Sequence, residues 1–149
     1  MHGLLQVIGY SANLTMFVSE DTAGSYTCQV TVPGYRTIQA AAQVRLEGPP
    51  TLLRFGPGPQ RGELGETGEL RCQAVAVPSA EAVVWSYRER VVSGRGGRHR
   101  VVTTRDKDKI ISTLTILQTR PADFGQYNCT VRNRLGENWQ LVELVQTGK

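Results

Sequence analysis

Cysteine is the residue type whose spacing in this chain points to a defined chemistry. The sequence has three cysteines, Cys28, Cys72 and Cys129. Trp85 follows Cys72 by thirteen positions, and Cys129 follows the same cysteine by 57. Two thiols can be oxidised to a disulfide in an oxidising compartment, and the odd count then leaves one thiol spare or without its partner. The chemistry that this pattern favours is therefore one structural disulfide.

Catalytic and metal-binding chemistry is not favoured by the remaining residues. The sequence has no Cys-x-x-Cys pair, and its two histidines, His2 and His99, are isolated, so a zinc site is not expected. His99 lies between Arg98 and Arg100, whose charges disfavour its protonation and make it a poor general base. No Gly-x-Ser-x-Gly elbow occurs. We predict that the protein is not an enzyme and has no catalytic residue, cofactor, metal site or small-molecule substrate.

The cysteine spacing also predicts the elements that must position the two thiols. In an immunoglobulin-type sandwich, a cysteine on strand B is bridged to one on strand F, and a strand-C tryptophan packs against the sulfurs. Tyr127 lies two residues before Cys129, where a tyrosine hydroxyl ties the turn before strand F to the backbone. Asp123 belongs to the same turn. We predict an all-β, immunoglobulin-like sandwich of I-set or C2 type, with a Cys72–Cys129 disulfide over Trp85.

A complete domain of this type is predicted over residues 52–149. Apolar and polar residues alternate in several segments with the period of a strand, so that every second side chain faces the core. In strand E this period places Leu114 and Ile116 inward. A disulfide that closes so long a loop would stabilise the domain by about 4 kcal/mol. The predicted strands are 52–55 (A), 70–74 (B), 82–87 (C), 98–104 (the next edge), 110–116 (E), 126–132 (F) and 139–145 (G).

Residues 1–47 predict only part of a preceding domain. The run that ends at Cys28 repeats the later turn, with Tyr26 again two residues before its cysteine. The acid of this turn is displaced by one position, because Asp21 lies seven residues before its cysteine instead of six. We expect strands E (12–16), F and G without strands A to D. Three such strands leave a core uncovered, and Cys28 is predicted to be unpaired.

The sequence Gly-Pro-Pro-Thr at residues 48–51 predicts a short, stiff linker between the two domains. Proline fixes its own backbone and donates no backbone hydrogen bond, so two consecutive prolines separate strands and limit hinge motion.

The composition indicates a globular chain without a membrane span. The 149 residues are 40% hydrophobic and 20% charged, with a formal net charge of +4. No apolar run reaches the roughly 18 residues that a membrane-spanning helix needs. The first ten residues contain no Lys or Arg, and we interpret them as a strand rather than an export leader. We expect this chain to lack both a signal peptide and a transmembrane segment.

A basic strip runs from Arg88 to Lys109. Arg95, Arg98 and Arg100 at its centre are candidate interface residues that could face an acidic partner. The favoured alternative is that these arginines lie on solvated edge strands, where charge prevents edge-to-edge pairing. Aromatic residues are not interleaved with them, so binding to nucleic acid is not expected.

Two Asn-x-Thr segments make Asn13 and Asn128 candidate glycosylation sites. Because Cys129 must face the core, the alternation of a strand turns Asn128 outward. Trp139 lies near the start of strand G, where alternation does not decide its direction. An exposed Trp139 would be a candidate interface anchor, but packing in the core is the favoured interpretation.

Several segments together resemble the membrane-proximal immunoglobulin domain of the kin-of-irregular-chiasm-like, or nephrin-like, adhesion receptors. The most specific are the runs Ser-Thr-Leu-Thr-Ile at 112–116 and Ala-Asp-Phe at 122–124, followed by Tyr-Asn-Cys-Thr at 127–130. Asn133-x-x-Gly136, Gly24-x-Tyr26-x-Cys28, Val32-Pro33 and Gly48-Pro49-Pro50 extend the resemblance over nearly the whole chain. One departure is Thr119, which stands where an aliphatic residue normally closes strand E.

The resemblance implies a non-catalytic, extracellular segment of a cell–cell adhesion receptor. Such receptors are glycoproteins of cell junctions that bind other cell-surface immunoglobulin-superfamily proteins, either copies of themselves or nephrin-like partners. Recognition in this family lies mainly in the first domains, so this segment resembles the stalk. The parent protein would lie at the plasma membrane and meet the membrane only through parts absent from this chain.

Two other interpretations remain open. The chain could be an intracellular structural immunoglobulin module of the muscle type, kept reduced and loaded mechanically. It could also be a truncated product without function, because its first sandwich is incomplete. The glycan acceptors and the Cys–Trp–Cys set favour the extracellular interpretation over the intracellular module.

Overall fold

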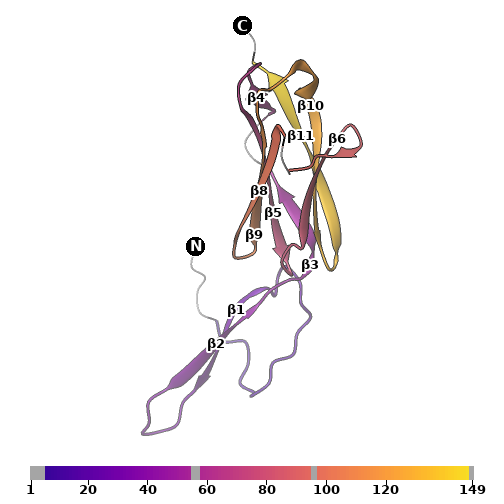
Figure 1. Cartoon of the computed structure of the whole chain (residues 1–149). Helices are drawn as coiled ribbons and strands as arrows, with labels where there is room; N and C mark the ends of the chain where they lie inside the picture. Colours follow the sequence, from indigo (N-terminus) through magenta and orange to yellow (C-terminus); the bar gives the residue numbers. More distant parts are fainter. Residues whose placement is uncertain (1–5, 55–57, 95–96, 148–149) are drawn as a thin grey trace. The chain divides into compact units, whose positions relative to one another are not determined.

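The computed structural model describes residues 6–54, 58–94 and 97–147, and these residues form two compact units. The first unit is Met1–Leu46 and the second is Glu47–Lys149. The regular structure of both units consists almost entirely of strands (Figure 1). Within the described ranges the only helical element is a 3-10 turn, η1 (Pro121–Asp123).

The first unit contains one antiparallel hairpin. Strand β1 (Gly24–Val30) pairs along its whole length with β2 (Ile38–Val44). Both strands are almost entirely exposed, because no second sheet covers either face within the described part of this unit.

Two strand predictions in the first unit are wrong. Residues 12–16, predicted as strand E, are not in a strand, and neither are the described residues 6–10 of the predicted first strand; residues 1–5 lie outside the described ranges. A strand needs a neighbour to pair with its backbone N–H and C=O groups. In residues 6–46, β1 and β2 pair only with each other, which leaves the upstream segment without such a neighbour.

The second unit is a sandwich of two sheets. A five-stranded sheet has the order β4-β11-β10-β6-β7, and a four-stranded sheet has the order β3-β5-β9-β8. These strands are β3 (Gly48–Leu53), β4 (Gln60–Gly62), β5 (Gly68–Val77), β6 (Ala82–Tyr87), β7 (Arg90–Val91), β8 (His99–Asp106), β9 (Lys109–Ile116), β10 (Gly125–Asn133) and β11 (Gly136–Gln146).

The segment 48–51, predicted as a linker, forms part of β3 instead. Strand β3 pairs antiparallel with β5, and the register shifts between Gly48 and Thr51. The two prolines lie in this irregular stretch, where their missing N–H groups break the ladder locally without preventing pairing at an edge of the sheet. The Gly-Pro-Pro segment therefore belongs to the second unit.

The core lies between the two sheets and confirms the predicted all-β, immunoglobulin-like sandwich. Strand β9 alternates between buried and partly exposed residues, and both Leu114 and Ile116 are fully buried as predicted. The first two strands of this unit belong to different sheets. Strand β3 lies in the four-stranded sheet, whereas β4 lies in the five-stranded sheet and runs parallel to β11. All other strand pairs in the second unit are antiparallel.

Candidate functional site

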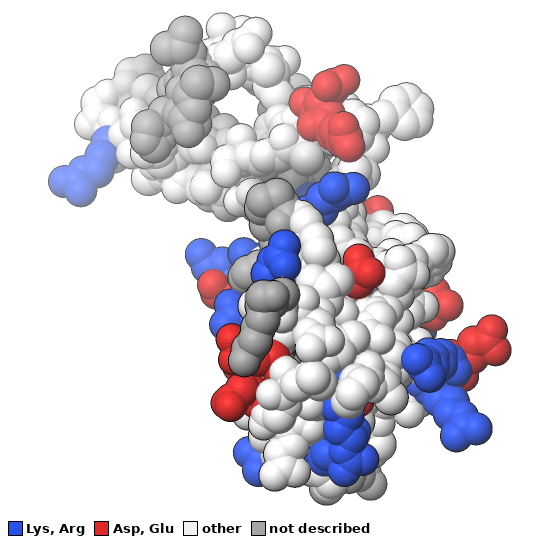
Figure 2. All heavy atoms as spheres, turned by 90° about the horizontal axis from the view of Figure 1, so that it is seen from above, with Lys and Arg blue, Asp and Glu red and all other residues white. Residues whose placement is uncertain are grey.

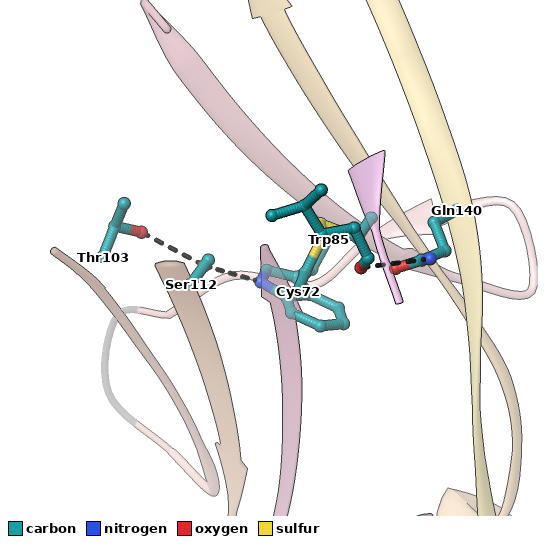
Figure 3. The surroundings of a disulfide bond; sticks show 7 residues. Cys72, Trp85, Thr103, Ser112 and Gln140 are labelled. Atoms are coloured by element: carbon teal, nitrogen blue, oxygen red, sulfur yellow. Dashed lines mark hydrogen bonds between the residues drawn. A yellow bond between two sulfur atoms is a disulfide. The ribbon is translucent and has the colours of Figure 1, made fainter. Parts of the chain in front are cut away.

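The predicted disulfide joins the two sheets at the centre of the second unit. Cys72 on β5 is bonded to Cys129 on β10, with 6.5 Å between their Cα atoms (Figure 3). Trp85 on β6 is 1% exposed, and its Nε1 donates a hydrogen bond to Ser112 Oγ at 2.9 Å. Thr103 Oγ1 in turn donates to the same Ser112 oxygen at 3.1 Å. The buried indole N–H is thus satisfied, as a buried polar group requires.

Tyr127 closes the turn before β10 as predicted for a tyrosine corner. Its buried hydroxyl donates to the Asp123 carbonyl oxygen at 2.7 Å. Its ring stacks on that of Tyr87, with 4.2 Å between the centroids. Burial, followed by the charge of Asp123, raises the pKa of Tyr127 well above its usual value. The phenol therefore stays protonated and remains a hydrogen-bond donor.

The Asp123 side chain forms an ion pair that the sequence did not predict. Arg98 donates from Nη1 to Oδ2 at 2.7 Å and from Nη2 to Oδ1 at 3.2 Å. Burial alone would raise the pKa of Asp123, but the hydrogen bonds from Arg98 and the Arg120 N–H, with the Arg98 charge, lower it overall. The pair joins the segment before β8 to η1, so Arg98 serves the fold rather than an exposed basic surface.

The same turn recurs in the first unit with a different side chain at the position of the acid. Tyr26 donates to the Thr22 carbonyl oxygen at 2.7 Å, and Thr22 stands six residues before Cys28. The Ser19 N–H donates to Thr22 Oγ1 at 2.8 Å, just as the Arg120 N–H donates to the Asp123 carboxylate at 2.7 Å. Thr22, not Asp21, therefore occupies the structural position of the acid.

The outer face of the five-stranded sheet carries an unusual group of exposed apolar side chains. Trp139 and Leu141 on β11 are 61% and 50% exposed, and Val84 on β6 is 41% exposed. In the register of the sheet, Trp139 and Val84 flank Thr130, while Leu141 lies opposite Asn128. We name Trp139, Leu141, Val84 and Val91 the outer apolar patch. The favoured prediction that Trp139 packs in the core is wrong, because the Asn133–Gly136 turn sets the phase of β11.

Asn128 lies on the central strand within this face. Its main-chain neighbours are Ser86 on one side and Leu141 on the other. The side chain is half-buried, so it points away from the core but is not fully open to solvent. Its Oδ1 atom is buried and has no hydrogen-bond partner among the described residues.

The other residues predicted for a site are scattered. Asn13 is exposed in a segment without regular structure, and Cys28 on β1 is an exposed free cysteine. Arg100 is exposed on β8, whereas Arg95 lies outside the described residues. Burial, followed by the charge of Arg98, lowers the pKa of His99. Within the second unit, neither His99 nor Arg100 is part of the outer apolar patch.

Charge does not gather into a single basic surface on the face that Figure 2 shows. Basic and acidic side chains are interspersed there around a wide uncharged area. Within the described residues, no group of three or more His, Cys, Asp or Glu side chains could hold a metal ion. The same residues include no helix that is long and apolar enough to cross a membrane.

Thr119 also has a structural role that its sequence position concealed. It is 2% exposed, and its Oγ1 donates to the Glu66 carbonyl oxygen at 2.7 Å. The Thr119 N–H donates to the same oxygen at 2.9 Å, and the Thr119 carbonyl accepts from the Gly65 N–H at 2.8 Å. The hydroxyl therefore replaces an aliphatic contact with a fixed link between two turns.

Comparisons with known proteins agree with this architecture. The family model described as immunoglobulin domain matches residues 49–133. The Irregular chiasm C-roughest protein of Drosophila melanogaster is 36% identical over 93% of this chain. Kin of IRRE-like protein 3 of Mus musculus is 32% identical over 88% of it. This chain spans only 18% and 17% of those two proteins, respectively.

A solved structure supports the fold at lower identity. The crystal structure of Dpr2 Ig1-Ig2 in complex with DIP-Theta Ig1-Ig3 matches 84% of this chain and 41% of the solved chain, with a TM-score of 0.71 and 24% identity. A likeness at that identity concerns the fold alone. The family match, the sandwich and the disulfide over Trp85 together show that the chain belongs to the immunoglobulin domain family, where it is similar to the roughest and Kin of IRRE-like proteins.

Proposed function

We propose that the chain is an extracellular segment of a cell–cell adhesion receptor, acting as a non-catalytic stalk or protein-binding module. The observation that carries this proposal is the Cys72–Cys129 disulfide across the core of a complete sandwich. Structural disulfides persist in oxidising environments such as the cell exterior and are rare in the cytosol. A reduced intracellular module of the muscle type would not retain this bond.

The similarity to the roughest and Kin of IRRE-like proteins supports the adhesion role. The partners that follow from it are other cell-surface immunoglobulin-superfamily proteins, either further copies of the same receptor or nephrin-like proteins. Because the chain spans less than a fifth of those relatives, recognition would involve other domains as well. The second unit would hold such domains at a distance from the membrane.

The first unit fits the end of a preceding immunoglobulin domain. Strands β1 and β2 correspond to strands F and G, and Tyr26 forms the same corner as Tyr127. The face that carries Cys28 is exposed, which is what a missing partner sheet would leave. We propose residues 1–47 as this partial domain and the second unit as the complete one.

The experiment is expression of the full chain behind an export leader in animal cells. We expect secretion of a protein in which non-reducing peptide mass mapping finds Cys72 bonded to Cys129 and Cys28 outside that bond. Beads coated with this protein are then mixed with beads that carry Kin of IRRE-like ectodomains or the chain itself. A free Cys72 in the secreted protein would contradict the extracellular assignment. If the beads do not bind, the protein-binding role is contradicted and the stalk role alone is retained.

A further inference from the structure

The outer apolar patch needs an explanation, because the residues on the solvent face of an antiparallel sheet are normally polar. Trp139, Leu141, Val84 and Val91 are between 41% and 71% exposed. Strand β11 contributes Trp139 and Leu141, and β6 and the short edge strand β7 contribute one valine each. All four lie on the same face of the sheet, on either side of the central strand β10. Patches of this kind mark places where something binds or covers the surface.

The sequence places a glycan acceptor at the centre of this patch. Asn128, Cys129 and Thr130 form the Asn-x-Thr triplet, and Asn128 and Thr130 both point to the outer face. Leu141 lies directly opposite Asn128, and Trp139 lies directly opposite Thr130. Trp139 is therefore the diagonal cross-strand neighbour of Asn128, a distance that an aromatic side chain can span.

The side-chain amide oxygen of Asn128 lacks a hydrogen-bond donor among the described residues. This atom, Oδ1, is buried. A buried acceptor without a partner costs about 1–3 kcal/mol. A sugar bonded to Nδ2 of the same amide brings N–H and O–H donors next to this oxygen, whereas an apolar protein surface docked on the patch would offer it no donor.

We propose that Asn128 carries an N-linked glycan whose first N-acetylglucosamine packs on Trp139 and covers the outer apolar patch. The sugar ring has an apolar face of C–H groups that can lie on the exposed indole and on Leu141, while its hydroxyls remain in water. The occupant of this sheet face is thus the chain's own carbohydrate. Adhesive contacts made by the second unit must then use other surfaces.

The modification requires a lipid-linked diphospho-oligosaccharide as donor, so this inference rests on the proposed extracellular function. In the transfer, a bond forms between Asn128 Nδ2 and C1 of the first sugar, and the bond from C1 to the diphosphate oxygen breaks. The lipid diphosphate is the leaving group, and Nδ2 loses one proton to a base of the transferase. No oxidant or reductant is involved.

Tryptophan fluorescence gives a direct readout of the packing. The chain contains two tryptophans, of which Trp85 is 1% exposed and Trp139 is 61% exposed. Acrylamide quenching therefore reports mainly on Trp139. The secreted full chain is compared in three forms: with its whole glycan, trimmed by an endoglycosidase that leaves the first N-acetylglucosamine, and stripped on the native protein by peptide N-glycosidase F.

We expect mass mapping to find Asn128 occupied. We expect the stripped chain to show a Stern–Volmer constant about twofold larger than the intact chain, because the indole loses its aromatic-face contact. The trimmed chain should resemble the intact one, since the first sugar makes the contact. Asn128→Gln should match the stripped chain, Asn13→Gln should match the intact chain, and Trp139→Phe should remove the quenchable signal.

Three results would overturn the proposal. The first is a secreted, disulfide-bonded chain in which Asn128 is unmodified. The second is an occupied Asn128 with equal quenching in all three forms. The third is a glycosylated chain that is dimeric and becomes monomeric on Trp139→Ser, which would assign the patch to a second copy. Failure of the proposed function itself would be recognised separately, by a free Cys72.

Discussion

Arg98 forms a bidentate ion pair with Asp123, in which both terminal guanidinium nitrogens donate hydrogen bonds, at 2.7 and 3.2 Å, to the two carboxylate oxygens. The aspartate side chain is 8% exposed and the arginine side chain 23%. Arg98 also donates to the Leu117 carbonyl oxygen at 3.3 Å. One arginine therefore closes the end of the sandwich where β8, β9 and the 3-10 turn meet.

Asp123→Asn is expected to lower the free energy of unfolding at pH 7 by about 2 kcal/mol, because it removes a charge-assisted pair that is largely buried. The folded-state pKa of Asp123 lies below the reference value of 3.8. The contribution is therefore fully present above that reference value and is lost as the pH falls through the folded pKa. Urea unfolding is followed by tryptophan fluorescence at several pH values. The free energies of unfolding of the variant and of the native chain should converge below about pH 4.

Asp106→Asn is the matched control for this prediction. Asp106 is exposed at the end of β8, and its loss should change stability by less than about 0.5 kcal/mol. Equal losses in the two variants would mean that the Arg98–Asp123 pair has no special role.

Tyr127→Phe is expected to cost about 1–2 kcal/mol, because the buried Asp123 carbonyl loses its donor while the ring stacking on Tyr87 is kept. The measurement is the urea midpoint from tryptophan fluorescence, and both tryptophans lie in the second unit. Tyr26→Phe removes the equivalent hydroxyl in the first unit and should leave this midpoint unchanged. An undiminished midpoint in Tyr127→Phe would show that the corner hydrogen bond is dispensable.

Glu89→Gly is expected to stabilise the second unit by about 1 kcal/mol. Arg88 and Glu89 form the two-residue loop between β6 and β7, and both have positive φ, at 51° and 64°. This turn favours glycine or asparagine, since other side chains crowd the backbone there. Thermal unfolding should show a raised midpoint for Glu89→Gly but not for Glu89→Ala, which removes the same charge without the backbone freedom. A gain of equal size in both variants would assign the effect to charge.

Cys72→Ser is expected to raise glycan occupancy at Asn128, a prediction that follows from the proposed modification. Strand β10 is paired on both sides, with β6 and β11, so its backbone is inaccessible once the sheet has formed. A transferase must act before that pairing is complete, and the loss of the disulfide delays it. Mass mapping of the secreted chain should show increased occupancy at Asn128 and no change at Asn13. Reduced occupancy at Asn128 would mean that transfer occurs on the folded domain.

Properties that depend on local pattern could be predicted from the sequence. The Cys72–Trp85–Cys129 spacing is typical of one kind of sandwich, so it predicted the disulfide. The two-residue alternation of β9 is set within a single strand, so it predicted the buried Leu114 and Ile116. The tyrosine corner was equally accessible, because its donor and acceptor lie four residues apart.

Properties that depend on pairing register could not be predicted. In the sequence Arg98 is one of several basic residues in a strip. Its ion-pair partner Asp123 lies 25 residues away, so no local pattern indicates the pair. The exposure of Trp139 is fixed by where the turn after Asn133 starts β11, which alternation within β11 does not reveal. The role of Thr22 was not predicted for another reason. Its carbonyl and hydroxyl groups make the contacts of the turn, whereas the sequence pattern indicated the adjacent acid, Asp21.

The parallel pairing of β4 with β11 has a mechanical consequence. Gln60, Arg61 and Gly62, near the start of the second unit, lie beside Leu144, Val145 and Gln146 at its end. The Thr147 N–H adds a hydrogen bond to the Gly62 carbonyl oxygen at 2.8 Å. Tension that draws the two ends of the unit apart would load these bonds in shear, so they must rupture together rather than peel open in sequence.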